Sequence, residues 1–197
     1  LRNFKQRPVK GNQFVLPLDL DQNEEKTYFI RAKSHTILKL PLEISTMQTH
    51  FETAHNEDLA NGIYFGLIFA LILYNFFVFI SIRDTTYLYY VFYIVFVAAT
   101  TSWLRGYSTE YLHAIPAGIN HGNTYAALAF VFLTLFTHSF LNLGKIAPKH
   151  KWIRIIFFAV SLITIVLTVT GRFYQSFFFI MIIVSINFPY IATFGIY

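Results

Sequence analysis

The stretch that decides the fold is LANGIYFGLIFALILYNFFVFISI, residues 59–82, in which 24 consecutive positions carry no charge. A helix of about 20 residues is roughly 30 Å long, which is the thickness of the hydrocarbon core of a bilayer. The run is far longer than a typical strand, and it does not alternate with charged residues as a membrane β-barrel strand would. It therefore predicts a transmembrane helix.

Four further apolar runs follow the first one along the chain. The expected spans cover residues 59–82, 86–104, 123–143, 152–170 and 177–197. Each is long enough to cross a bilayer as a helix. The fold class that we predict for residues 59–197 is therefore a multi-span α-helical membrane bundle in contact with the lipid bilayer.

Lys and Arg are distributed unevenly over the short segments between these spans. The segments after the first and third spans, with the edge of the fourth, hold Arg83, Lys145, Lys149, Lys151 and Arg154, whereas the alternate loops hold Arg105 and Arg172. Positively charged short loops stay on the cytoplasmic side of the membrane. We therefore expect the N-terminal segment to be extracytoplasmic. In the first of these turns, Asp84 is expected to cap the second helix.

Charge separates the chain into two parts. Residues 1–60 hold 16 of the 25 charged side chains, and the remaining 137 residues hold nine. The formal net charge of +5 comes entirely from the second part, where basic residues lie between apolar runs, so nucleic acid is not an expected partner. The chain has no Cys, which excludes disulfides, thiolate metal sites and cysteine nucleophiles.

Residues 1–58 follow a different pattern from the rest of the chain. Between residues 14 and 45 apolar side chains recur at every second position, as in Leu38, Leu40 and Leu42, and this period is typical of a half-buried β-strand. We expect three antiparallel strands that form the C-terminal part of an extracytoplasmic β-sandwich. Because the chain opens without an initiator Met, we expect it to be a piece of a longer protein.

The loop between the second and third spans concentrates polar side chains. Arg105, Glu110, His113 and His121 are the candidate ligand-binding residues, because they would face the outer domain. His113 and His121 are eight positions apart, which is not a recognised spacing for metal ligands, so no metal site is expected. The sequence also lacks the motifs HExxH and GxSxG and a Walker-type loop, so we expect no catalytic residue and no cofactor.

Polar side chains within the spans are the other candidates for a functional role. They are Asn75, His138, Asn142 and Asn187. His138 is either a proton relay or ligand contact, or a neutral histidine bonded to a neighbouring helix, and we prefer the second interpretation. Interhelical hydrogen bonds are the expected role of Asn75 and Asn187.

Small residues recur at every fourth position at the start of the first span. Gly62, Gly66 and Ala70 lie on one stripe of a helix, and such a stripe lets two helices approach closely. Packing within the chain is the preferred interpretation, and the seam of a homodimer is the alternative.

The sequence from Gly62 to Tyr90 resembles the first two spans of the bacterial seven-transmembrane receptors with diverse intracellular signalling modules. The features that carry this resemblance are the Gly-Ile-Tyr-Phe-Gly run, the Tyr74-Asn75 pair and the Arg83-Asp84 turn. The strands before the first span are similar to the closing strands of that family's extracytoplasmic domain. Leu112 to Pro116 depart from the family, which tends to have a Leu-Trp-Pro-like element in this loop.

The resemblance implies a sensor in the inner membrane. Its outer domain would bind a small molecule or carbohydrate, and a cytoplasmic kinase, phosphatase or cyclic-dinucleotide module beyond Tyr197 would supply the output. A homodimer is a further expectation. Two alternatives stay open, namely a membrane transporter or channel, and a membrane assembly factor.

The expected orientation can be tested with topology reporters. A reporter fused near Lys149 should report a cytoplasmic location, and one fused near Ser108 should report an extracytoplasmic location. The reason is that the basic loops remain in the cytoplasm. Alkaline phosphatase and green fluorescent protein fusions would measure this. The reverse pattern would contradict the external N-terminal segment.

Overall fold

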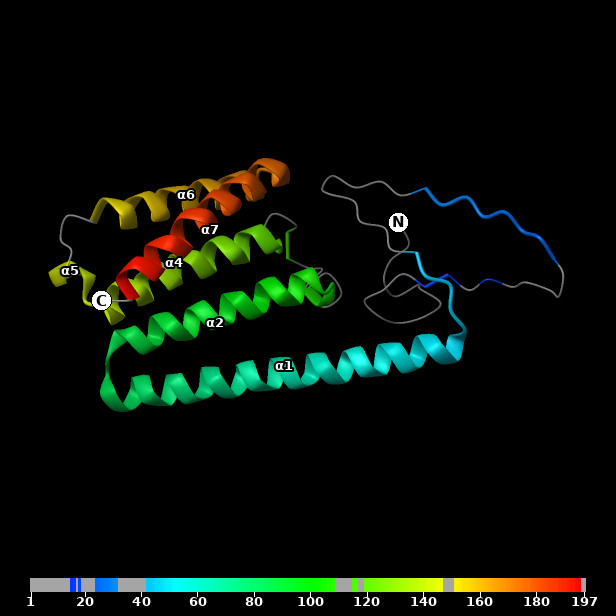
Figure 1. Ribbon diagram of the computed structural model, residues 1–197, viewed down its shortest axis with the longest axis horizontal. Coiled ribbons are helices and arrows are strands. Elements are labelled where there is room, and N and C mark those ends of the chain that lie inside the picture. The colour runs from blue at the N-terminus through cyan, green and yellow to red at the C-terminus, as the bar shows by residue number, and fades with distance from the viewer. Residues whose placement is uncertain are drawn as a thin grey trace.

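The computed structural model describes residues 15–16, 18, 24–31, 42–108, 115–116, 119–146 and 151–195. Long helices lie side by side in alternating directions, and the described parts of the N-terminal segment, residues 24–31 and 42–46, lie beyond one end of the bundle (Figure 1). The helices are α1 (Met47–Ile82), α2 (Thr85–Leu104), α4 (Gly122–Phe140), α5 (Leu143–Ile146), α6 (Lys151–Val169) and α7 (Phe173–Gly195).

Helix α1 is 36 residues long and begins at Met47, well before the expected start at residue 59. Thr46 caps it, since its side-chain oxygen accepts a hydrogen bond from the Thr49 N–H at 3.2 Å. At 1.5 Å per residue the helix is about 54 Å long, which exceeds the hydrocarbon core of a bilayer. The charged N-terminal third of α1 therefore projects from the apolar part as one continuous helix.

The turn between α1 and α2 is tight, as the sequence predicts. Arg83 ends α1 in the left-handed conformation with φ 60°, and its N–H donates to the Phe79 carbonyl at 2.7 Å. Asp84 caps α2 by accepting a hydrogen bond from the Thr86 N–H at 2.9 Å. That bond holds the pKa of Asp84 below its ordinary value, so the carboxylate is charged at neutral pH.

Helix α4 lies at the centre of the bundle. It packs against α2 on one side and against α6 and α7 on the other, while α1 packs against α2 (Figure 1). The buried side chains of α4 are small or polar: Asn123, Thr124, Ala127, Ala129, Thr134 and Thr137. Neighbouring helices shield these groups from lipid, so this helix tolerates polar residues that a lipid-facing helix would not.

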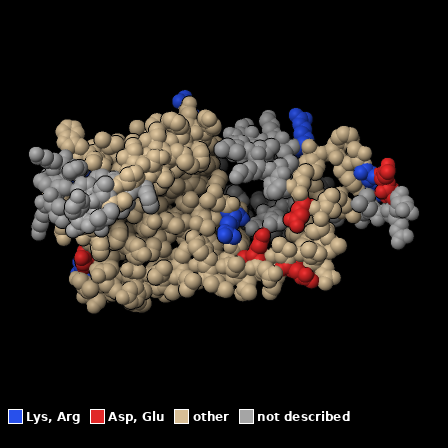
Figure 2. Space-filling model, in the orientation of Figure 1, with Lys and Arg blue, Asp and Glu red and all other residues tan. Residues whose placement is uncertain are grey.

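Three helices of the described chain are long and apolar enough to cross a membrane, namely α1, α2 and the Trp152–Val169 part of α6. Helix α7 contains a shorter apolar stretch, Phe173–Asn187. The protein is therefore a helical multi-span membrane protein, and the membrane crossing of α4 and α7 stays a prediction. The visible flank of the bundle is almost free of Lys, Arg, Asp and Glu, which lie toward its ends and along the N-terminal part (Figure 2).

Helices α4 and α7 run in the same direction and are joined at two levels. Asn123 Nδ2 donates to Ser176 Oγ at 2.6 Å, and Asn187 Nδ2 lies 3.5 Å from Thr134 Oγ1. The two bonds are eleven residues apart on each helix, which is about three turns. Both bonds therefore lie along one stripe of each helix and hold the pair in register.

Most of the expected β-strand residues lie outside the described chain. Residues 24–31 and 42–46 are described, and neither range contains a strand. The side chains of Phe29 and Ile44 are 95% and 87% exposed there. The three-strand prediction is not tested by these short ranges and stays a prediction.

Candidate functional site at the ends of the helix bundle

His121 lies at the bundle end that is nearer to the N-terminal segment, where α2 ends and both α4 and α7 begin. Its ring is stacked on Phe173 at 4.3 Å with an interplanar angle of 9°, and it lies 4.4 Å from the ring of Trp103. Its Nδ1 accepts a hydrogen bond from the Asn123 N–H at 3.2 Å, which caps α4. Burial lowers the pKa of His121, so the ring is neutral at neutral pH.

The burial of His121 changes the role expected for it. The side chain is 8% exposed, because it fills the space between α2, α4 and α7. A ring held between two aromatic rings contributes packing and a helix cap. In this structure His121 therefore joins three helices and does not face an open ligand site.

Asn120 closes the segment that leads into α4. Its Oδ1 accepts hydrogen bonds from Ser108 Oγ and, at 3.0 Å, from the hydroxyl of Tyr125. Its Nδ2 donates to the Ser108 carbonyl at 3.2 Å. Asn123, near the start of α4, extends this set of hydrogen bonds. Its Nδ2 donates to the Phe173 carbonyl at 3.2 Å as well as to Ser176 Oγ. The polar run before α4 thus connects the end of α2 to the start of α7.

A cavity of about 310 Å³ lies at the same end, between α1 and the end of α2. The Tyr107 hydroxyl donates to Asp58 Oδ1 at 3.3 Å and accepts from Asn61 Nδ2 at 2.9 Å. Gly62, Phe65 and Ser102 complete the lining. Burial raises the pKa of Tyr107, which keeps its hydroxyl protonated. A carboxylate, an amide and a hydroxyl thus meet at one point of this cavity and bond one another.

The structure describes two of the four residues expected to bind a ligand, Arg105 and His121, and the ligand-binding role of the set stays a prediction. Arg105 ends α2 and is exposed, with its N–H donating to the Thr101 carbonyl at 3.0 Å. Its charge acts on nearby Tyr107. Glu110 and His113 lie outside the described residues.

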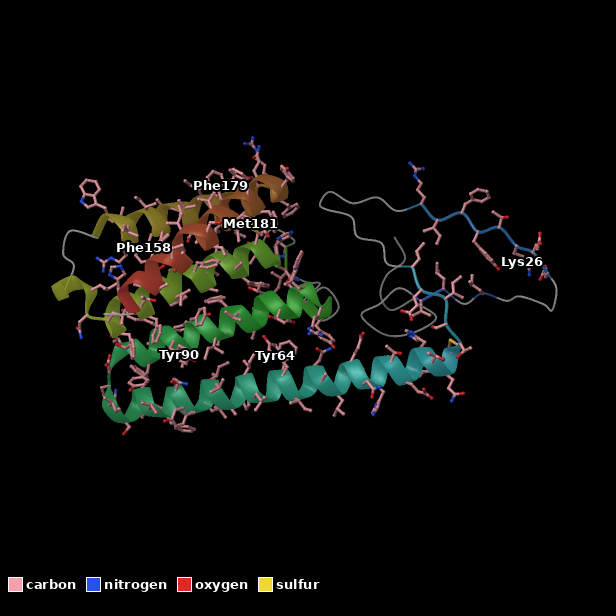
Figure 3. The ribbon with its side chains drawn as sticks, in the orientation of Figure 1. Lys26, Tyr64, Tyr90, Phe158, Phe179 and Met181 are labelled. Atoms are coloured by element: carbon pink, nitrogen blue, oxygen red, sulfur yellow. The ribbon has the colours of Figure 1, made fainter. Side chains whose placement is uncertain are left out.

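Sequence reasoning missed Asp58, Asn61 and Tyr107. A signal for the first two was present, because they are three positions apart and therefore share a helix face. Their relation to Tyr107 depends on how α1 and α2 pack. Figure 3 shows Tyr64 pointing from α1 toward α2, where its hydroxyl lies 3.3 Å from Thr101 Oγ1.

The polar residues expected within the spans occupy different environments. Asn75 is buried and donates to the Leu71 carbonyl of its own helix at 2.8 Å. His138 lies half-buried in the last turn of α4, within electrostatic range of Arg154. Asn142 is exposed in the turn after α4 with φ 48°, a conformation that Asn tolerates better than most residues. Asn187 is buried beside Thr134.

The small-residue stripe of α1 is not packed against another helix in the described chain. A Cβ added to Gly62 or Gly66 would meet no atom within 4 Å, and Ala70 is exposed. Their role in helix packing stays a prediction. Gly122 is the opposite case, because a Cβ there would lie 2.5 Å from Cε3 of Trp103.

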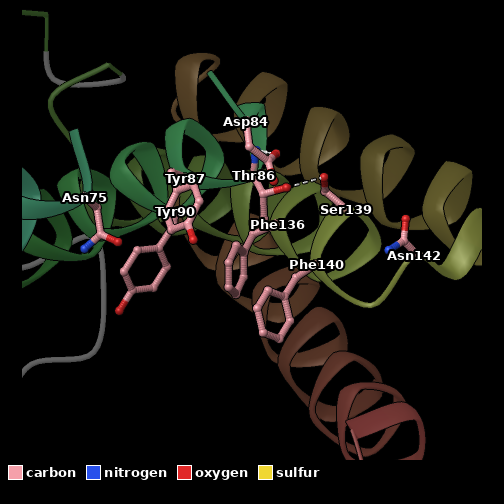
Figure 4. Close-up of a pocket in the computed structure, with 9 residues that line it drawn as sticks. All are labelled: Asn75, Asp84, Thr86, Tyr87, Tyr90, Phe136, Ser139, Phe140 and Asn142. Carbon is pink, nitrogen blue, oxygen red and sulfur yellow. Dashed lines mark hydrogen bonds between the residues drawn. The ribbon is translucent and has the colours of Figure 1, made fainter. Parts of the chain in front are cut away.

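A metal centre is not formed by the described residues, among which no three His, Asp or Glu side chains gather closely enough to hold an ion. A second cavity, of about 460 Å³, lies at the opposite end of the bundle and includes Asn75, Thr86, Tyr90 and Ser139 in its wall (Figure 4). There the Thr86 and Ser139 hydroxyls are 2.6 Å apart and join α2 to α4.

Comparison with known families divides the chain at the start of α1. A family model described as 7TM diverse intracellular signalling matches residues 57–197, and one described as 7TMR-DISM extracellular 2 matches residues 1–46. The two matches confirm the resemblance drawn from the sequence. They cover an extracellular domain and a membrane region, with no catalytic domain identified. No curated protein and no solved structure matches the chain.

The close approach of Trp103 to Gly122 can be tested with a matched pair of substitutions. Gly122→Ala should lower the free energy of unfolding by about 1–3 kcal/mol, because the added methyl group overlaps the indole ring. Gly66→Ala, at an open position of α1, should be neutral or stabilising by up to about 1 kcal/mol, because Ala favours helix more than Gly does. Thermal unfolding in nanodiscs would measure both, and equal effects would contradict the packing at Gly122.

The burial of His121 predicts a pH-dependent stability. The folded-state pKa lies below the ordinary value of 6.5, so the unfolded chain binds a proton more readily. The contribution of neutral His121 should be complete above about pH 6.5 and decrease as the pH falls toward the lower folded-state pKa. Unfolding temperatures from about pH 8 to about pH 5 for wild type and His121→Phe should therefore converge at low pH. Parallel curves would contradict a buried, neutral His121.

Proposed function

This chain belongs to the 7TM diverse intracellular signalling family, and from that premise we propose that its helices couple ligand binding outside the membrane to an output module inside the cell. Residues 57–197 are the membrane region of a signalling receptor, and residues 1–46 before them belong to an extracellular domain. In the proposal, the ligand is a small molecule or carbohydrate bound by the extracellular domain. The kinase, phosphatase or cyclic-dinucleotide module lies beyond Tyr197, and the receptor resides in the inner membrane.

The observation that carries the proposal is the continuity of α1. One helix runs from Met47, directly after the extracellular match, to the turn at Arg83 on the other side of the bundle. A helix cannot be compressed without loss of backbone hydrogen bonds, so a shift or rotation at its outer end is transmitted along its length. A ligand can drive such a shift only if it binds one helix arrangement more tightly than another.

The outer end of the bundle provides a path from α1 to the other helices. The Tyr107 hydroxyl bonds Asp58 and Asn61 of α1, and thereby links that helix to the segment after α2. His121 and Asn123 then connect this region to α4 and to the first turn of α7. A displacement of α1 at Asp58 would thus reach α7 through contacts that are already in place.

Helix α7 has two features that favour a second arrangement. Pro189 lacks the N–H that would bond the carbonyl four residues earlier, so the helix is weakened there. Asn187 Oδ1 is buried and has no hydrogen-bond partner among the described residues. An unpaired buried acceptor destabilises the arrangement that contains it. Movement of α7 about this region would allow Asn187 Oδ1 to find a partner.

A homodimer is part of the proposal, with Gly62, Gly66 and Ala70 of α1 as its seam. The stripe is open in the single chain, and small residues at this spacing suit the close approach of a second helix. A dimer related by such a seam would place two extracellular domains and two output modules side by side.

The proposal is tested on the full-length receptor by removing one hydroxyl. Tyr107→Phe should change the activity of the output module and the distance between spin labels on Cys introduced at Ser81 and Trp152, because α1 is released from the segment after α2. The 197 residues of this chain contain no Cys, so any Cys in the rest of the receptor would be replaced before the two positions are labelled.

Tyr64→Phe is the matched control, since it removes one exposed hydroxyl bond between α1 and α2 and leaves the bonds of Tyr107 intact. We expect its spin-label distances and output to equal those of wild type. If Tyr107→Phe also leaves both unchanged while the protein unfolds at its normal temperature, coupling through this junction is contradicted.

A further inference from the structure

The cavity of about 460 Å³ at the end opposite to the N-terminal segment takes no part in the proposed coupling path. Its volume falls within the usual range of roughly 300–1,000 Å³ for small-molecule sites. Residues of α1, α2 and α4 form its wall, and it extends from Asp84 at the turn to Asn75 within α1 (Figure 4). The cavity therefore opens at the interface and reaches below it.

One wall of this cavity is aromatic. The rings of Tyr90 and Phe136 lie 5.1 Å apart, and those of Phe136 and Phe140 lie 5.4 Å apart, so the three form a continuous series from α2 to α4. Tyr87, one helical turn before Tyr90, also lines the cavity. The faces of aromatic rings carry negative potential and attract organic cations.

The polar groups of the cavity also favour an organic cation. Asp84 is the one charged residue among the described residues that line it, and its carboxylate is held in place by the Thr86 N–H. Asn75, which is 8% exposed, uses its Nδ2 to bond the Leu71 carbonyl, and Figure 4 shows its amide oxygen on the side of the tyrosines. No Lys or Arg is among the described residues that line the cavity, so an anion would meet the Asp84 carboxylate there, whereas an ammonium group would meet acceptors.

The position of the cavity indicates where such a group would come from. Because the N-terminal domain is extracellular and α1 crosses the bundle once, the Arg83-Asp84 turn lies on the cytoplasmic side. Asn75 is seven residues before the end of α1, about 11 Å deeper along the helix. Asp84 is therefore at the depth of the lipid headgroups, where the ammonium group of an aminophospholipid is abundant.

We propose that this cavity binds an organic ammonium group at the cytoplasmic face, with Asp84 as its counter-ion and Tyr90, Phe136 and Phe140 as its aromatic wall. A phospholipid headgroup and a soluble amine are the two sources of this chemistry. Occupancy would join α2 to α4 next to the Thr86–Ser139 contact, so the ligand would stabilise this arrangement of the two helices.

The experiment measures the unfolding temperature of the purified protein in phosphatidylglycerol nanodiscs. One arm replaces increasing fractions of the lipid with phosphatidylethanolamine, and the other adds tetramethylammonium or ethanolamine to the buffer. We expect a saturable increase in the unfolding temperature. An increase in the lipid arm alone identifies a headgroup as the ligand. An increase with the soluble amines identifies a free amine. Both results support the site.

Two variants and a control make the result specific. Asp84→Asn preserves a residue that caps helices well but removes the charge, and it should weaken the apparent affinity at least tenfold. Tyr90→Leu removes the ring that α2 contributes to the aromatic wall and should do the same, whereas Tyr89→Leu, next to it but outside the lining, should respond as wild type does. If Asp84→Asn does not fold, Tyr90→Leu alone tests whether the cavity binds the ammonium group. The absence of a saturable increase in both arms, or an undiminished increase in Tyr90→Leu, would overturn the proposal.

Discussion

The hydrocarbon interior of a bilayer offers no hydrogen-bond partner, so each polar group that the bundle carries into it must be satisfied by the chain itself. The hydroxyls of Thr100, Thr164 and Thr168 accordingly donate to the carbonyls four residues earlier on their own helices. Helix α4, which has the most buried polar residues, lies between the other helices. This requirement explains both the helical fold and the central position of α4.

The two ends of the bundle are joined by different kinds of contact. At the outer end the stacked rings around His121 and the amides of Asn120 and Asn123 tie α2, α4 and α7 together. At the opposite end the hydrogen bond between Thr86 and Ser139 and the contact between the rings of Tyr90 and Phe136 join α2 to α4 beside a cavity.

Much of the fold could be predicted because its signals are local. The length of an uncharged run reports a span, and the Asp84 cap depends on a hydrogen bond to a residue two positions away. The start of α1 was harder to predict, since residues 47–58 carry charges and give no hydrophobic run. The site was largely missed, because Tyr107 meets Asp58 only after α1 and α2 have packed.

The sequence by itself determined the family, the helical membrane class and the side of the membrane on which the N-terminal domain lies, because hydropathy, charge distribution and local motifs are all read along one chain. The tertiary structure decided the role of individual polar residues. It placed His121 between two rings, left Gly66 open and brought Asp84 near Tyr90 and Phe136 around one cavity. These outcomes depend on contacts between helices that are far apart in sequence, and no local pattern specifies which face of a helix meets its neighbour.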